Sequence, residues 1–573
     1  MRSPKATGLL VAAAGMTLLA QTSAVLADAS SEQYRGCDGY GAASSAGDGM
    51  TEWATVLLLF NPPGYGNTSR SGASRGAEGI ADCDAALVDL PTKHWRRKVS
   101  LLRARALHRL DEGDAPGAIS DLDLADAAAS TGNDLLYARS LGLGVKYVRA
   151  LAVRRSGQEA NGEALALSTE AERPYDRQSV VAAMIALGPK APKDDRIGLE
   201  RALAKLVPTA VDALFVEALA GADFKNAIVL YGQLTPYREY GLVNISDGQQ
   251  RERQMRDFAM EEFFRASRAG AYAFALAAVG RDADARAALA EARTKLSADT
   301  QPPPPLDPSL SSSEHARETA YREENVANRK KVAELAGQTI DQWQSRVEMR
   351  LALSAGNAAQ ALAALKASQL KPGWPEKTML DEILQRLPKA DVSSRGAAQA
   401  LRASISDVGE EPSLETLFKA LPEPETAERV PPYIEARKPF LAMTGSQADL
   451  DAEGYRTRGP DGRGVVTVGF RGDRGTASMI EEMALLRTAD MARQQGKKKI
   501  LIVDRRDTAF SISTTYYGTP LRTDPDGFQT ELDVLLTNAD SLPAEFTGQA
   551  WRLLDADEIY NALAPVYIRP QAK

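Results

Sequence analysis

The chain has 573 residues, with 69 basic and 76 acidic side chains and only 2 cysteines. Hydrophobic residues make up 44% and charged residues 25%, a balance typical of globular chains and not of disordered or collagenous ones. A net charge of −7 argues against a nucleic-acid binder, since such proteins carry concentrated lysine and arginine. Three histidines and two cysteines are too few for most metal clusters built from these residues, so we expect no metal and no cofactor.

The N-terminal residues have the pattern of an export signal. Arg2 and Lys5 precede an apolar run over residues 9–20, which is too short for a membrane span of about 20 residues. A polar stretch follows directly after Ala27. We therefore predict a signal peptide over residues 1–27, cleavage after Ala27, and a periplasmic or secreted mature protein without a later transmembrane segment. A buried N-terminal helix is the alternative.

Export changes the interpretation of the two cysteines. Cys37 and Cys83 lie in a loop-rich segment, residues 28–94, that is rich in glycine, serine and proline between them. In an oxidising compartment an even pair predicts a disulfide, and two unrelated structural thiols are the alternative. On the chain-entropy model, such a bridge would stabilise the fold by roughly 3–4 kcal/mol.

Helical periodicity dominates residues 95–300. A recurring pattern has a turn residue, a small residue five positions later, and then apolar residues at helical spacing. Each occurrence predicts an αα-hairpin in which the small residue lies where the two helices approach. The turn and small positions are Gly113 and Ala118, Ala222 and Ala227, Gly280 and Ala285, and Gly356 and Ala361, with a weaker copy at Gly157 and Gly162.

This order of small, turn and aliphatic positions resembles the tetratricopeptide repeat (TPR), most clearly over residues 271–295. The resemblance covers roughly residues 95–370. It implies stacked hairpins with a concave surface that binds a protein or peptide. The turns are unevenly spaced, whereas the repeat has a period of about 34 residues, so extra helices or loops must lie between hairpins. A non-repetitive helical domain is the alternative.

Tyrosine and arginine side chains on the first helices are candidates for the partner-binding surface of such an array. The candidates are Tyr137, Arg139, Tyr147 and Arg149. A solvated helix face is the alternative for each of them.

Proline-rich segments divide the chain that follows. Residues 301–313 are expected to form a proline/serine linker or loop, because proline removes backbone donors and ends helices. Residues 314–420 predict further helices, including a TPR-like hairpin near 343–368. Residues 421–450 predict a second linker.

The last segment, residues 451–573, predicts a small α/β domain. Strands are expected over 464–470, 499–504 and 529–536 from β-branched content and alternation, and helices over 477–495 and 555–563. The predicted fold class is therefore mainly α, with a TPR-like α-hairpin array followed by a small α+β C-terminal domain.

This C-terminal order resembles a domain of uncharacterised bacterial envelope lipoproteins. The chain departs from that family because it lacks a lipid-attachment cysteine and carries a large helical region in front. The resemblance implies no catalytic residue. The matching positions are Tyr455, Phe470, Leu485, Arg487, Ala489, Ile502, Val503 and Asp504.

Catalytic motifs are scarce. The chain has no Gly-x-Ser-x-Gly elbow and no P-loop. His94 and His108 are expected to be helix-surface or capping residues. Asp504 and Asp507, expected at the end of a strand, form the best acidic cluster. The Asp524–Gly527 segment, expected in a loop, lacks the further ligands of a calcium site, and turn formation explains it more simply.

Two functional hypotheses remain. The first is an exported, non-enzymatic scaffold that binds a protein or peptide partner in the bacterial cell envelope and does not bind nucleic acid. The second is an envelope hydrolase or carbohydrate-processing enzyme in which Asp504 and Asp507 perform the acid–base chemistry.

Overall fold

The computed structural model describes most of the chain from residue 32 onward. The residues that it describes are 32–39, 73–88, 90, 94–129, 134–235, 247–298, 311–368, 370–406, 411–436, 453–516, 519–538 and 542–568. The predicted signal peptide, residues 301–310 of the first predicted linker and residues 437–450 of the second lie outside this part. Within it the protein is mostly helical, with a five-stranded antiparallel sheet near the C-terminus, so the predicted mainly-α class is confirmed.

Helices occupy nearly all of the described chain up to residue 420. Among these helices, none combines the length and the apolar character needed to cross a membrane. In chain order they are α3 (Gly76–Val88), α4 (Trp95–Asp111), α5 (Ala115–Ala128), α6 (Leu135–Arg139), α7 (Leu141–Arg155), α8 (Glu159–Glu170), α9 (Arg177–Leu187), α10 (Lys193–Leu206), η2 (Pro208–Ala210), α11 (Val211–Ala220), α12 (Phe224–Tyr231), α13 (Asp247–Ala278), α14 (Asp282–Ala298), α15 (Ser312–Ser354), α16 (Ala358–Ala367), α17 (Trp374–Arg386), α18 (Val392–Ala403) and α19 (Leu414–Ala420).

The predicted disulfide is present. Cys37 and Cys83 are bonded, with their Cα atoms 4.6 Å apart, and join a helix over residues 32–38 to α3. The described part of the segment expected to be loop-rich is therefore largely helical.

His108 holds this disulfide-linked pair against α4. It was expected at a helix surface, and that prediction is wrong, because only 4% of the residue is exposed. Its Nε2 lies 2.7 Å from the Cys37 carbonyl oxygen, which makes Nε2–H the donor. Burial lowers the pKa of His108, so the neutral ring is favoured.

A helix–turn–helix unit lies at each of the five predicted turns. The turn residues have positive φ, which glycine adopts at little cost. In every unit the residue after the turn donates its N–H to the carbonyl five positions earlier, at 2.8–3.2 Å, which closes the first helix. The φ values are 77° at Gly113, 90° at Gly157, 59° at Ala222, 79° at Gly280 and 87° at Gly356.

The small residue five positions later lies where the two helices of a unit meet. Four of these residues have no exposed surface at all: Ala118, Ala227, Ala285 and Ala361. At the fifth position, Gly162, an added Cβ atom would stand 2.6 Å from the Ala150 carbonyl oxygen. Close helix approach therefore explains the size of the residue at all five positions.

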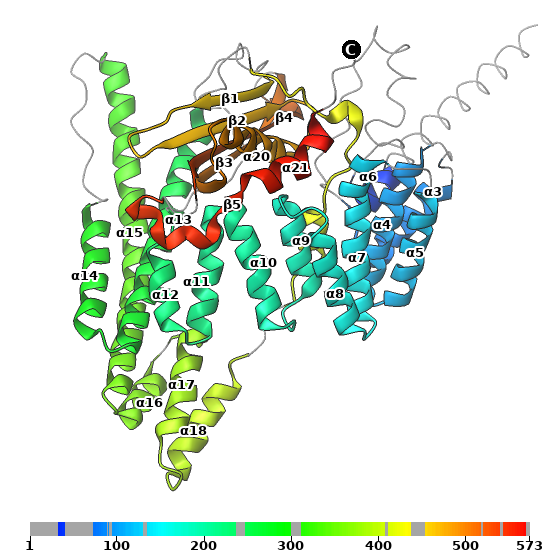
Figure 1. Ribbon diagram of the computed structural model, residues 1–573. Coiled ribbons are helices and arrows are strands. Elements are labelled where there is room, and N and C mark those ends of the chain that lie inside the picture. The colour runs from blue at the N-terminus through cyan, green and yellow to red at the C-terminus, as the bar shows by residue number, and fades with distance from the viewer. Residues whose placement is uncertain are drawn as a thin grey trace, which may run out of the picture.

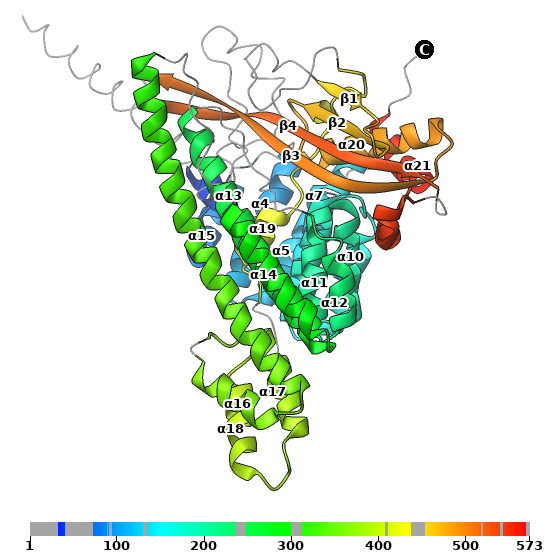
Figure 2. The ribbon, with the colours of Figure 1, turned by 90° about the vertical axis from the view of Figure 1, so that its left-hand side faces the viewer.

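The units lie side by side in a curved row that runs from α3 to α15, with α16, α17 and α18 extending from one end (Figure 1). The sheet and its helices lie along one edge of this row. Figure 2 shows the same arrangement from the side, with α13 and α15 running next to each other over much of their length.

The C-terminal unit has strand order β1-β2-β4-β3-β5, all antiparallel. β3 and β4 are far longer than predicted and form a hairpin that extends beyond the other strands (Figure 2). The Asp524–Gly527 segment lies inside β4, so the predicted loop is wrong there. The elements are β1 (Gly454–Arg458), β2 (Val465–Gly472), α20 (Ala477–Gln494), β3 (Lys499–Tyr516), β4 (Thr519–Thr537), η5 (Ala544–Arg552), β5 (Leu554–Asp555) and α21 (Ala556–Tyr567).

The first part of the helical row and the sheet share one hydrophobic core, whereas α11–α18 pack around a second one. Side chains of α4–α10 and of α19 belong to the same buried cluster as those of α20, α21 and the sheet face beneath them. The segment expected as a second linker takes part in this packing over its described residues, because Leu421 and Glu425 are almost fully buried.

Candidate functional site

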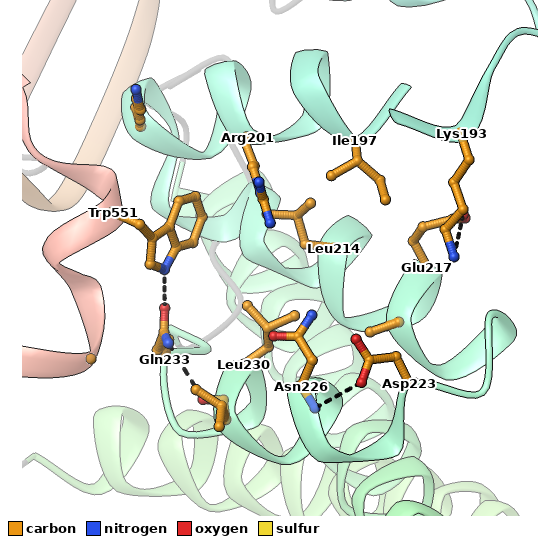
Figure 3. A pocket seen from close by; sticks show the side chains of 14 residues that line it. Lys193, Ile197, Arg201, Leu214, Glu217, Asp223, Asn226, Leu230, Gln233 and Trp551 are labelled. Atoms are coloured by element: carbon orange, nitrogen blue, oxygen red, sulfur yellow. Dashed lines mark hydrogen bonds and ion pairs between the residues drawn. The ribbon is translucent and has the colours of Figure 1, made fainter. Parts of the chain in front are cut away.

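A groove of about 630 Å³ opens between α10, α11, α12 and η5 (Figure 3). Three of its walls come from consecutive helices of the row, whereas the fourth comes from η5, which lies more than 300 positions further along the chain. Packing of the C-terminal unit against the helices therefore closes one end of the groove.

One face of α10 forms the cationic wall. Lys193, Ile197, Arg201 and Lys205 recur every four residues and all line the groove. Residues four apart lie above one another on a helix, so the three cations form a stripe along α10. Figure 3 shows Arg201 directed into the groove beside Leu214.

The facing wall is apolar. It consists of Leu214 and Ala218 from α11 and of Val229 and Leu230 from α12. Val229 is 58% exposed, although a branched aliphatic side chain gains from burial. This wall therefore offers apolar surface that a ligand could cover.

The end wall from η5 is held by two contacts. The Trp551 indole N–H donates to the Gln233 side-chain oxygen at 2.9 Å (Figure 3). The adjacent Arg552 is fully buried and donates to the carbonyls of Ala204 at 2.9 Å and Ile502 at 2.7 Å. Burial lowers the pKa of Arg552 to about 10. These contacts fix Trp551 relative to α10, so the groove is formed before any ligand arrives.

The opposite end of the groove is acidic. Asp223 accepts the N–H of Asn226 at 3.3 Å and so caps α12, while Glu217 lies 3.9 Å from the Lys193 ammonium. Glu200, next to this end on α10, is partly buried. Burial and the neighbouring Glu217 raise its pKa to about 6, against the opposing effect of Arg196 and Lys193.

The four residues expected to form a partner-binding surface serve mainly internal contacts. Tyr147 has no exposed surface, and the Tyr137 ring packs edge-on against Trp95 at 5.0 Å. The Arg139 guanidinium donates to Glu482 of α20 at 2.7 Å. Arg149 pairs with two exposed carboxylates of α5. None of the four lines the groove, and Tyr147 cannot contact a partner from its buried position.

A buried set of charged residues, which we call the Arg173 network, joins the helices to the sheet unit. Arg173, between α8 and α9, donates to Glu482 at 2.8 and 3.1 Å and to Glu425 at 3.0 Å. Tyr567 of α21 also donates to Glu482. Burial alone would raise the pKa of Glu482, but the guanidinium groups of Arg139 and Arg173 lower it to about 2. The network is fully enclosed, so its role is structural and it offers no access to a ligand.

The acidic candidates Asp504 and Asp507 do not form a pair. A β-bulge at Val503 reverses the side-chain alternation of β3, and no further shift follows between 504 and 507. Residues three apart on a strand point to opposite faces, so the two carboxylates are separated by the sheet.

Asp507 is also fully engaged. Its carboxylate accepts hydrogen bonds from Arg505 at 2.8 Å, Arg177 at 3.3 Å and Thr530 at 2.9 Å. Burial would raise its pKa, but Arg505 and Arg177 lower it below its ordinary value. A carboxyl that stays ionised and engaged in this way is poorly suited to act as a general acid.

The groove was not predicted from the sequence, and the reason is physical. The four-residue spacing of Lys193, Ile197, Arg201 and Lys205 was visible in the sequence and places the three cations on one face of a helix. Trp551 gave no such signal, because only the tertiary packing brings η5 to α10.

Among the described residues, no group of three or more histidine, cysteine or acidic side chains is placed to hold a metal ion. Comparisons with known proteins do not indicate a function, because no protein-family model, no curated protein and no solved structure matches this chain.

Proposed function

We propose that the protein is an exported, non-enzymatic scaffold of the bacterial cell envelope that uses TPR-like helical hairpins to bind a protein or peptide partner. The partner binds in the groove between α10, α11, α12 and η5. The observation that carries this proposal is the groove itself, which combines a cationic wall, an exposed apolar wall and a fixed aromatic end.

Two features support the compartment and the repeat character. The Cys37–Cys83 disulfide fits an oxidising compartment such as the periplasm or the medium, because thiols stay reduced in the cytosol. The five units with matching turns and small residues support the TPR-like reading.

The hydrolase alternative receives less support. Its two carboxylates, Asp504 and Asp507, lie on opposite faces of β3, and Asp507 is held ionised by arginine neighbours. No observation on the structure favours a second pair in their place.

The proposal is tested by placing a photo-crosslinking amino acid at Val229, in the groove, in the full chain produced by its native host. A discrete adduct is expected from this position. A matched substitution at Val392 on α18, which is 76% exposed and far from the groove, should give none. Equal labelling from both positions, or no adduct from Val229 in a protein that unfolds at the wild-type temperature, would contradict the proposal.

A further inference from the structure

The charge pattern of the groove indicates which kind of partner it accepts. Arg201 and Lys205 are without an ion-pair partner anywhere in the part of the chain that the structure describes, whereas Lys193 at the other end lies 3.9 Å from Glu217. Positive charge is therefore left uncompensated only at the η5 end, beside Trp551.

The spacing of these two cations matches an extended chain. Four helical residues rise by about 6 Å, which is the separation of Arg201 and Lys205 along α10. Alternate side chains on one face of an extended peptide are about 6.6 Å apart. Two carboxylates at positions i and i+2 of a peptide lying along α10 would therefore reach both cations.

The residue between those two carboxylates would point the other way. On that side lie Leu214, Leu230 and the exposed Val229, with Trp551 at the end. An apolar side chain at the middle position would cover this surface, with a favourable free energy of about 25 cal/mol per Å² buried.

The acidic end sets the position of the peptide. Asp223 would repel carboxylates placed there, and Lys193 at that end already lies near Glu217, so the acidic residues must lie at the η5 end. The apolar wall also disfavours polyanions without apolar groups, because their hydration would be lost without compensation.

On the basis of the proposed function, we infer that the groove binds an extended acidic peptide segment in which an apolar residue stands between two acidic residues (acid–apolar–acid). Its two carboxylates pair with Arg201 and Lys205, and its central side chain packs against Leu230, Val229 and Trp551. Recognition needs no free terminal carboxylate, since the cations contact side chains.

The test uses the mature protein, immobilised, and peptides that are acetylated and amidated so that they lack terminal charges. The probe is Ser-Glu-Leu-Glu-Leu-Ser. Two controls separate charge from spacing: Ser-Gln-Leu-Gln-Leu-Ser lacks the carboxylates, and Ser-Glu-Glu-Leu-Leu-Ser has the same composition with the acids adjacent. The probe should bind more tightly than either control by about tenfold, and its affinity should fall with added salt.

Variants locate the site. Arg201→Glu with Lys205→Glu should weaken probe binding by about tenfold or more, while binding of Ser-Lys-Leu-Lys-Leu-Ser should improve over the wild type. Lys366→Glu with Lys389→Glu, two exposed lysines outside the groove, makes the same charge change and should leave binding unaltered within about twofold. Thermal unfolding at the wild-type temperature verifies that each variant is folded.

Three results would overturn the inference: no binding of the probe at millimolar concentration, equal binding of the glutamine peptide, or an unchanged affinity in the Arg201/Lys205 variant. These results are independent of the crosslinking test. An adduct at Val229 without acidic-peptide binding would leave the scaffold proposal standing with another class of partner. Binding of the acidic peptide without a crosslinked adduct at Val229 would mean that the groove binds such a peptide in vitro but has no partner in the cell, so the scaffold proposal would fail.

Discussion

Single buried or partly buried side chains decide much of the chemistry of this protein. Glu200 beside the groove is one such residue, because its Oε2 atom is buried without a hydrogen-bond partner and Glu217 lies nearby. Its pKa rises from 4.5 to about 6 for these reasons. Ionisation of Glu200 therefore opposes folding.

The sign of the effect follows from proton binding. Between pH 4.5 and about 6 the folded protein holds the Glu200 proton while the unfolded chain releases it, so stability falls as the pH rises through this interval. The shift would correspond to roughly 2 kcal/mol for a fully buried group. Glu200 is only partly buried, and solvent screening reduces the expected effect to below about 1 kcal/mol.

Glu200→Gln should consequently raise the free energy of unfolding at pH 8 by up to about 1 kcal/mol and leave it unchanged at pH 4. Urea unfolding at the two pH values measures the difference. Asp194→Asn, an exposed carboxylate on the first turn of the same helix, is the control and should give no gain at pH 8. A gain of equal size at both pH values would show that ionisation is not the cause.

At the scale of elements, the turns were predictable because their causes are local. At four of the five turns, a glycine that tolerates positive φ and a small residue five positions later were both visible in the sequence; at the fifth the turn residue is Ala222, and there the small residue was the signal. The strands of the sheet centre were predictable for the same reason, from alternation and β-branching.

Elements whose causes are distant were missed. The outer part of β4 carries aspartate, proline and glycine, which indicate turns, yet the hairpin pairs this segment with β3 as a strand. The Arg173 network consists of charged residues that look ordinary in sequence and meet only in the fold. One signal was available: in α20, apolar residues directly precede and follow Glu481 and Glu482, a setting that favours burial and pairing of the two carboxylates.

Gly162 gives a sharp test at this scale. Alanine normally stabilises a helix interior by about 1 kcal/mol relative to glycine. At Gly162 the new Cβ would stand 2.6 Å from the Ala150 carbonyl oxygen and 2.7 Å from the Arg154 nitrogen, which are backbone atoms of the facing helix. Gly162→Ala should therefore destabilise the protein by about 1–3 kcal/mol.

The matched variant is Gly198→Ala, in the interior of α10, where an added Cβ meets nothing within 4 Å. It should stabilise the protein by about 0.4–1 kcal/mol. Chemical denaturation of both variants yields the comparison. Similar changes in the two proteins would mean that α7 and α8 do not pack as closely as described.

At the scale of the whole molecule, the helical row and the sheet unit behave as one structure. Helices α4–α10 share a hydrophobic core with the sheet unit, and the Arg173 network crosses the boundary between them with ion pairs that have no exposure to solvent. Such pairs contribute little net stability when intact, but removing one partner leaves the others buried without compensation. Loss of Arg173 should therefore weaken both parts together.

Arg173→Met should lower the free energy of unfolding by about 3–5 kcal/mol, because Glu482 and Glu425 lose their shared cation. Lys146→Met is the control. It removes the same charge from an exposed pair with the neighbouring Glu172, and should cost less than about 1 kcal/mol.

Hydrogen exchange distinguishes a joint loss from a local one. In Arg173→Met, amides of α7 and α9 and amides of α20 and β2 should lose protection by similar factors, since the network contacts both sides. Its loss of stability should also shrink as the pH falls from 4.5 toward 2, because protonated Glu482 no longer needs the cation. Reduced protection in the sheet alone would show that the two parts unfold independently, and the η5 wall of the groove could then detach from α10 without unfolding the helices.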